Sequence, residues 1–191
     1  MNTQELMDIA LKAANLDETP SDSGIIVSGE GIKKVLMGVD METAELLLAR
    51  QLGYDCVVSH HPKDGGTAML ELMDTHIRNL EALGTPRNKG QKLLEERKTE
   101  LNYNMHVANS DRSGSAAKLL EMPYMSLHTP ADIIGQNMVQ EFLDKKFGDK
   151  SDTKVQDIVE ALEEIPEYKN SIEKPVIRVG GKDSYPEKST S

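Results

Sequence analysis

DCVVSHHP, residues 55–62, is the stretch of sequence that decides both the expected fold and the expected chemistry. Its first half has the apolar character of a short buried strand, and the strand ends in two adjacent histidines and a proline. Imidazole is the commonest protein ligand for a transition metal at neutral pH. We therefore expect a metal site where this strand ends.

The order of the two histidines bears on how many ions they serve. Successive side chains of a strand point to opposite faces, so His60 and His61 are predicted to serve two ions, or one ion and one substrate. Pro62 restricts His61 to an extended backbone and turns the chain away from the strand tip. The alternative is a structural pair of histidines at a turn, because short motifs of this kind also occur without a metal.

The residues before this stretch predict a strand, a helix and a second strand. Residues 33–39 have a strand pattern, Asp40 can cap a helix over residues 41–52, and Gly53 stops that helix. Such a unit needs a right-handed crossover and parallel strands. The histidines then lie at the carboxyl end of a parallel strand, where the ligand sites of open α/β sheets gather.

The rest of the chain also alternates helix and strand patterns. Residues 24–28 are predicted to pair with residues 33–39 as a hairpin, and residues 124–127 and 176–179 to form two more strands. Further helices are predicted over residues 3–15, 68–83, 89–103, 112–121, 129–147 and 155–162. The helix over residues 41–52 is too rich in leucine for a surface helix that is covered on one side only.

These patterns predict an α/β fold with a mixed or mostly parallel sheet flanked by helices. We expect a single α/β domain over residues 1–181, followed by a frayed C-terminal tail over residues 182–191.

Length, charge and cysteine content limit the classes of function. The chain has 191 residues, which is enough for a substantial core, and a net charge of −10, which disfavours a nucleic-acid partner. We expect no membrane span and no signal peptide, because no stretch has the required length and apolar character. Cys56 is the single cysteine, so an intrachain disulfide is excluded. A cytoplasmic protein that binds neither nucleic acid nor membrane is predicted.

Two later segments add candidate site residues. His106 lies in a predicted break between helices, and Asp111 follows five residues on, so the two side chains can converge on one point. Asp111 has an alternative role as the cap of the next helix. His128 ends the strand over residues 124–127, and a helix start accounts for Thr129 and Asp132 but not for His128. Imidazoles with a carboxylate suit Zn, Mn, Fe, Co or Ni better than Mg or Ca.

The run from Val35 to Pro62, VLMGVDMETAELLLARQLGYDCVVSHHP, resembles the NIF-three-like proteins, whose members are often called GTP cyclohydrolase I type 2 homologues. Residues 106–111 resemble the H-T-N-x-D motif of that family, with one extra residue between histidine and aspartate. The stretch from Asp111 through HTPAD to about Phe147 resembles most an archaeal-type branch. The resemblance covers about residues 25–147.

That resemblance implies an α/β fold around a dinuclear metal site in a ring-shaped homo-oligomer. It implies that His60 and His61 each ligate one metal ion and that Asp111 bridges or binds both ions. It also makes His106 a candidate catalytic acid–base group beside the ions.

One part of the family pattern is missing. Family members complete the site with a later H-x-x-x-E motif, and this chain has no histidine after His128. Three explanations stay open. The chain is a fragment of a longer protein, or His128 and Asp132 fill the place of the missing motif, or the site is incomplete.

The predicted function is that of a metal-dependent hydrolase acting on a small phosphorylated or nucleotide-like substrate. Two ions bridged by a carboxylate would activate a water molecule and hold a phosphoryl group. GTP cyclohydrolase activity does not follow, because the chain has no P-loop-like glycine run. The alternative is a non-catalytic metal-binding scaffold or chaperone, which the missing ligands favour. A third reading is a metal-free α/β domain with vestigial ligands.

Overall fold

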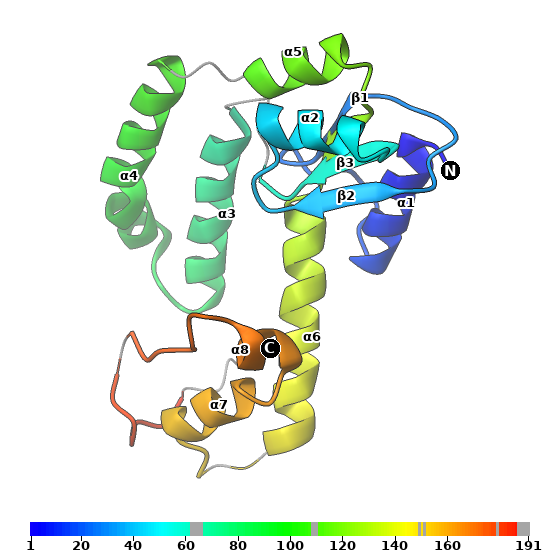
Figure 1. Cartoon of the computed structure of the whole chain (residues 1–191). Coiled ribbons are helices and arrows are strands. Elements are labelled where there is room, and N and C mark those ends of the chain that lie inside the picture. Colours follow the sequence, from blue (N-terminus) through cyan, green and yellow to red (C-terminus); the bar gives the residue numbers. More distant parts are fainter. Residues whose placement is uncertain (62–66, 108–110, 149, 151, 179, 187–191) are drawn as a thin grey trace. The chain divides into compact units, whose positions relative to one another are not determined.

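The structure is a computed structural model that describes residues 1–61, 67–107, 111–148, 150, 152–178 and 180–186 (Figure 1). Its elements are, in chain order, α1 (Thr3–Ala13), β1 (Gly24–Val27), β2 (Val35–Gly38), α2 (Thr43–Gln51), β3 (Cys56–Ser59), α3 (Thr67–Ala82), α4 (Arg87–Val107), α5 (Arg112–Leu119), β4 (Tyr124–Ser126), α6 (Thr129–Phe147), α7 (Val155–Leu162) and α8 (Pro166–Asn170). The chain divides into two units, Met1–Ile134 and Gly135–Ser191, and α6 contributes residues to both.

A four-stranded mixed sheet with the order β1-β4-β3-β2 organises the first unit. β2 is parallel to β3, with Val35 opposite Cys56, and β3 is parallel to β4. β1 is antiparallel to β4. The predicted parallel strand–helix–strand unit is therefore confirmed, and so is the α/β fold class with a mixed sheet and flanking helices.

Hydrophobic clusters cover both faces of this sheet because the side chains of β3 and β4 alternate between them. Val57 and Tyr124 belong to the cluster that includes Leu46 and Ala49 of α2 and Ala117 of α5. The second cluster contains residues of α1 and the neighbouring strand positions, namely Met7, Ile32, Cys56, Val58, Met125 and Leu127. Figure 1 shows α2 and α5 on one side of the sheet and α1 on the other.

The predicted hairpin of residues 24–28 and 33–39 is wrong, because β4 and β3 lie between β1 and β2. The connection between β1 and β2 is held by other parts of the chain. Thr3 N donates to Gly29 O at 3.0 Å. A Cβ atom on Gly29 would lie only 2.2 Å from Cγ of Pro123, so this glycine allows a close approach to the start of β4.

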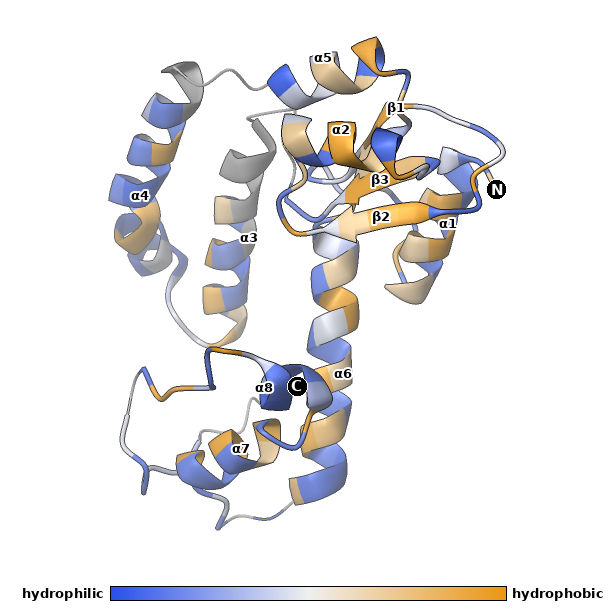
Figure 2. Ribbon diagram, viewed as in Figure 1, coloured by the Kyte–Doolittle hydropathy of each residue, from blue (hydrophilic) through white to orange (hydrophobic). Residues whose placement is uncertain are grey.

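The start and the surface of α2 also differ from the prediction. The helix begins at Thr43, and Glu42 N donates to the Glu45 carboxylate at 2.9 Å, so Asp40 is not its cap. Only Leu46 and Ala49 of α2 are buried. The three remaining leucines of residues 47–52 are about half exposed, and part of the ribbon of this helix has the colour of hydrophobic residues in Figure 2.

α3 and α4 pack against each other. α4 continues to Val107, so the predicted break at His106 is wrong at its start, and His106 lies in the last turn of a helix. Residues 108–110 of that predicted break lie outside the described residues.

The second unit contains α7, α8 and most of α6. Residues 176–178 form no strand, and residue 179 of that predicted strand lies outside the described residues, as do residues 187–191 of the predicted tail. Lys154 pairs with Asp183 at 2.8 Å, which raises the pKa of the lysine and lowers that of the carboxyl. Among the described helices, none combines the length and hydropathy that a membrane crossing requires.

Candidate metal centre

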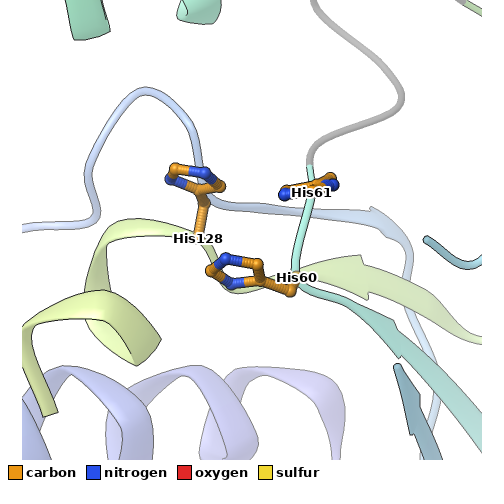
Figure 3. Close-up of side chains that lie close together, drawn as sticks. All are labelled: His60, His61 and His128. Atoms are coloured by element: carbon orange, nitrogen blue, oxygen red, sulfur yellow. The ribbon is translucent and has the colours of Figure 1, made fainter. Parts of the chain in front are cut away.

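Three histidines meet at the carboxyl ends of the two central strands. β3 ends at Ser59 and is followed by His60 and His61, and the parallel strand β4 ends two residues before His128. Each histidine offers one nitrogen, and these three nitrogens all lie within 4.8 Å of one another. Figure 3 shows the three imidazoles gathered between the end of β3 and the start of α6.

The two adjacent histidines do not separate to opposite faces as predicted. The ring centroids of His60 and His61 are 5.0 Å apart, and the ring of His128 stacks on that of His60 at 4.6 Å. The alternation rule fails here because both histidines follow the last residue of β3 and are no longer part of the strand.

The outer strands bring carboxylates to the same edge of the sheet. Asp40 lies two residues after the end of β2, which is parallel to β3. β1 runs in the opposite direction, and Gly24 is opposite Ser126, so the residues before β1 also reach this edge. Asp22 and Ser23 are those residues. All four strands therefore contribute to one site.

The Nδ1 atom of each histidine is hydrogen-bonded to an oxygen acceptor. The acceptors are Leu127 O at 3.3 Å for His60, Asp40 Oδ1 at 3.0 Å for His61, and Asp22 Oδ2 at 2.9 Å for His128. Since a carboxylate can only accept, a neutral His61 or His128 ring that donates from Nδ1 keeps its lone pair on Nε2. In His60 both ring nitrogens have an acceptor beside them, because Nε2 lies 3.4 Å from Oδ1 of Asp132, so either nitrogen can carry the proton. A metal-ligating histidine is typically held by such a bond from its other ring nitrogen.

Asp132 lies beside the histidines in the first turn of α6. Its Oδ1 is 3.4 Å from Nε2 of His60, and its Oδ2 is 3.6 Å from Nδ1 of His128. Its side chain is 60% exposed and is therefore free to turn toward a bound ion or substrate. An acidic residue in the first turn of a helix is favourable in itself, so the helix start also accounts for this position. The Thr129 hydroxyl, at the first residue of α6, donates to Asp22.

Ser59 fixes the backbone around His61. The Ser59 side chain is fully buried, and its Oγ donates to His61 O at 2.9 Å. The same Oγ accepts from Met41 N at 3.2 Å, which ties the residues after β2 to the end of β3. One hydroxyl thus holds both His61 and the segment that carries Asp40.

The donor set fits a divalent transition metal ion. Three imidazoles and a nearby carboxylate match the ligands that zinc and its neighbours in the first transition row prefer. In a tetrahedral zinc site the ligand nitrogens are roughly 3.3 Å apart. The three nitrogens here span up to 4.8 Å, so side-chain rotations are required to close the group around one ion. Carboxylates on three sides of the group favour a cation.

The other two predicted site residues are Asp111 and His106. Asp111 directly precedes α5, is exposed, and makes no capping hydrogen bond through its side chain to the described residues. The histidine group, searched among the described residues, does not include it. The side chain of His106 lies outside the described part of the structure.

Cys56 is excluded as a ligand by its position and protonation. It begins β3, at the end of the strand away from the histidines, and is fully buried. Burial raises the pKa of its thiol to about 11, with a smaller contribution from Asp55, so the thiolate that binds metals is not present at neutral pH.

Sequence reasoning missed two carboxylates that hold the histidines, Asp22 and Asp40. Asp40 was assigned to a helix cap, and Asp22 lies 106 residues from its partner His128, so no local pattern could connect them. Asp132, by contrast, is already a candidate in the sequence, together with His128, for the place of the missing motif.

The fold and the site together define an α/β protein with a cluster of imidazoles at the carboxyl edge of its sheet. A solved structure of a NIF3 superfamily protein from Sphaerobacter thermophilus is similar, with a TM-score of 0.89 and 33% sequence identity over 97% of this chain and 68% of that chain. No family model matches the chain, and a search of curated proteins found no match. The chain belongs to the NIF3 superfamily, which confirms the family resemblance.

Proposed function

We propose that this chain binds divalent metal ions through His60, His61 and His128 and uses them to hydrolyse a small phosphorylated or nucleotide-like substrate. The observation that supports this is that the Nδ1 atom of each of the three rings is hydrogen-bonded to an oxygen acceptor. Such an arrangement prepares Nε2 lone pairs for a cation before any ion arrives.

The residues differ in their proposed roles. His60 and His128 have side chains that are only 21% and 15% exposed, and they form the inner wall of the site. His61, at 46%, faces the solvent and marks the side from which a substrate approaches. Asp132 supplies an oxygen ligand, or it accepts a proton from the substrate side. This proposal places His128 and Asp132 where the family pattern has its later histidine and acid.

A bound divalent ion would supply Lewis-acid polarisation and a water molecule of lowered pKa. The chain's part is to orient the ligands and to exclude water from the inner wall. We retain from the sequence analysis the expectation of two ions per site, with Asp111 as a second carboxylate ligand and His106 as an acid–base group.

Metal content of the purified protein tests the binding part of this proposal. We expect stoichiometric Zn, Mn, Fe, Co or Ni by elemental analysis, and a loss of at least one ion per chain in the variants His60→Ala and His128→Ala. His76→Ala is the matched control, because His76 is an exposed histidine on α3 outside the histidine group. Retention of metal by both site variants would refute the assignment.

Asp111→Ala tests the carboxylate that the sequence predicted. A two-ion site with a bridging Asp111 requires this variant to lose metal as well. If Asp111→Ala keeps the wild-type content while Asp132→Ala loses it, Asp132 is the carboxylate ligand.

A substrate panel tests the catalytic part. Metal-loaded protein is assayed with phosphomonoesters, phosphodiesters, nucleotides and GTP, beside His61→Ala and the His76→Ala control. We expect turnover of at least one small phosphorylated compound that His61→Ala lowers by roughly 100-fold or more, as expected when an essential metal group is lost. No turnover by any metal-loaded sample would refute the hydrolase.

The second candidate is a non-catalytic metal-binding scaffold or chaperone. The exposed position of His61 favours it, because an open coordination position permits exchange of the ion. Rapid transfer of metal to a chelator, without turnover in the panel, would support this alternative. A tightly held ion that does not exchange would count against it.

Three further expectations from the family resemblance belong to this proposal. We propose a ring-shaped homo-oligomer, which light scattering of the purified protein tests. We propose a cytoplasmic location, and we assign the chain to the archaeal-type branch on the stretch from Asp111 to Phe147. GTP cyclohydrolase activity is tested by the GTP arm of the substrate panel.

A further inference from the structure

Asp22 is a buried carboxylate at the edge of the sheet that holds the histidines. It lies two residues before β1, and its residue surface is only 3% exposed. A buried carboxylate is costly unless hydrogen-bond donors surround it. Its surroundings therefore indicate what it is there to hold.

The donors around Asp22 come almost entirely from the start of α6. Oδ2 accepts from Nδ1 of His128 at 2.9 Å and from the Thr129 hydroxyl at 2.5 Å. Oδ1 accepts from the Ser23 hydroxyl at 3.1 Å and from the Thr129 backbone N–H at 3.4 Å. Ser23 Oγ in turn accepts from the backbone N–H of His128 at 3.0 Å. Both carboxylate oxygens are thus occupied, and both the ring and the backbone of His128 are fixed.

We infer that Asp22 is a positioning residue that fixes the tautomer and the ring orientation of His128, so that Nε2 of this ring keeps its lone pair for a metal ion. The inference rests on the proposed function, since it takes His128 as a metal ligand. According to this inference, the segment before β1 influences metal affinity directly, although it lies far in sequence from the histidine motifs.

The chemistry of the contact makes a specific substitution informative. All four groups that face the two oxygens are donors, so the carboxylate suits them and an amide does not. In Asp22→Asn one oxygen becomes an NH₂ group. Where this group faces His128 it donates to Nδ1, and the ring proton must move to Nε2. A ring with its proton on Nε2 has no lone pair there for a metal ion.

The tautomer of His128 can be measured without any metal. Long-range ¹H–¹⁵N correlation spectra of the metal-free protein at pH 8.5, where histidine is ordinarily neutral, distinguish the Nδ1–H from the Nε2–H form. We expect the Nδ1–H form for His128 in the wild type and an increase of the Nε2–H form in Asp22→Asn. An Nε2–H form in the wild type would overturn the inference even if the variant failed to fold. An unchanged tautomer in a folded variant would overturn it as well.

A second measurement follows the metal itself. Titration with Co²⁺, read by its visible absorption, should show affinity weaker by about 10- to 100-fold in Asp22→Asn, the range typical of lost outer-shell partners. The matched control is Asp55→Asn, which also removes a carboxylate that accepts two backbone N–H groups, from Lys33 and Lys34, at the other end of β3. The control should bind Co²⁺ like the wild type.

The two measurements separate two kinds of failure. If the wild type binds no Co²⁺, the proposed function is refuted. The tautomer measurement would still decide whether Asp22 fixes the tautomer of His128. Normal binding by the wild type with equal affinity in Asp22→Asn would overturn the inference and leave the proposed function standing.

Discussion

At the scale of single residues, the hydrogen bond of one ring nitrogen determines what the other nitrogen of a histidine can do. The three histidines each direct one nitrogen to a protein oxygen. Cys56 shows the opposite situation, because it lies among apolar neighbours and burial raises the pKa of its thiol to about 11. The same sheet thus carries the histidine group at one end and a protonated, buried thiol at the other.

The raised pKa of Cys56 predicts how stability depends on alkaline pH. The folded chain keeps the proton up to about pH 11, whereas the unfolded thiol loses it near the ordinary value of 9.0. The stabilisation of the folded state that results from this difference in pKa is therefore fully present below about pH 9. It is lost as the pH rises from 9 to 11, by about 2–3 kcal/mol in total. Urea unfolding across this pH range measures it, and Cys56→Ala should lack this part of the slope. Equal slopes in both proteins would contradict the prediction.

The carboxyl of Asp55 predicts a dependence at acidic pH with the opposite sign. Hydrogen bonds from the backbone N–H groups of Lys33 and Lys34 lower its pKa in the folded state. Its contribution to stability is present above the ordinary carboxyl value near 4 and is lost as the pH falls through the lower folded pKa. Comparing the unfolding midpoints of wild type and Asp55→Asn at pH 3 and pH 7 tests this. The difference between the two proteins should shrink at pH 3.

At the scale of elements, Met41, in the loop between β2 and α2, is tied to the sheet by two hydrogen bonds. Ser59 Oγ accepts from Met41 N, and Tyr124 Oη donates to Met41 O at 2.8 Å. Both contacts are buried, but only Ser59 also holds the carbonyl of His61. The two tethers can therefore be separated by mutation.

Ser59→Ala and Tyr124→Phe form a matched pair. Each removes one buried hydrogen bond to Met41, so each should lower the free energy of unfolding by about 1–3 kcal/mol. Only Ser59→Ala releases His61, so only this variant should also weaken Co²⁺ binding. Urea unfolding and Co²⁺ titration of both variants test this. An equal loss of Co²⁺ affinity in both would mean that stability alone controls the site.

The parts of the fold that the sequence predicts are those set by neighbouring residues. The pattern of residues 33–59 is enough for β2, α2 and β3, because a parallel crossover is specified within one short stretch. The pairing of β1 joins residues 24–27 to residues 124–126, which no local pattern contains. The site divides in the same way, because His60 and His61 stand in one motif whereas Asp22 acts across 106 residues.

At the scale of the whole molecule, the first unit holds every residue of the histidine group and its carboxylates. The second unit, Gly135–Ser191, contributes none of them. Binding of a metal ion is therefore linked to the stability of the first unit.

This linkage predicts a thermal shift on metal binding. Free Co²⁺ at 100 times its Kd should stabilise the first unit by about 2.7 kcal/mol, which corresponds to a rise in Tm of roughly 5–10 °C for a chain of this size. Differential scanning calorimetry with and without Co²⁺ measures the shift, and a chelator should reverse it. If the two units melt separately, only one transition should move. A Tm that does not respond to the ion would contradict the linkage.

The antiparallel direction of β1, which brings Asp22 beside His128, also bears on the order in which the residues of the site are synthesised. Asp22 is synthesised first and His128 last among the residues of the site, which in chain order are Asp22, Asp40, His60, His61 and His128. The hydrogen bond between Asp22 and His128 can form only after His128 has been synthesised. The group of three histidines is complete only once His128 has been made, in contrast to a zinc finger, whose ligands lie close in sequence. We therefore expect the metal to be loaded after translation of the sheet is complete, onto a scaffold that has already folded without it.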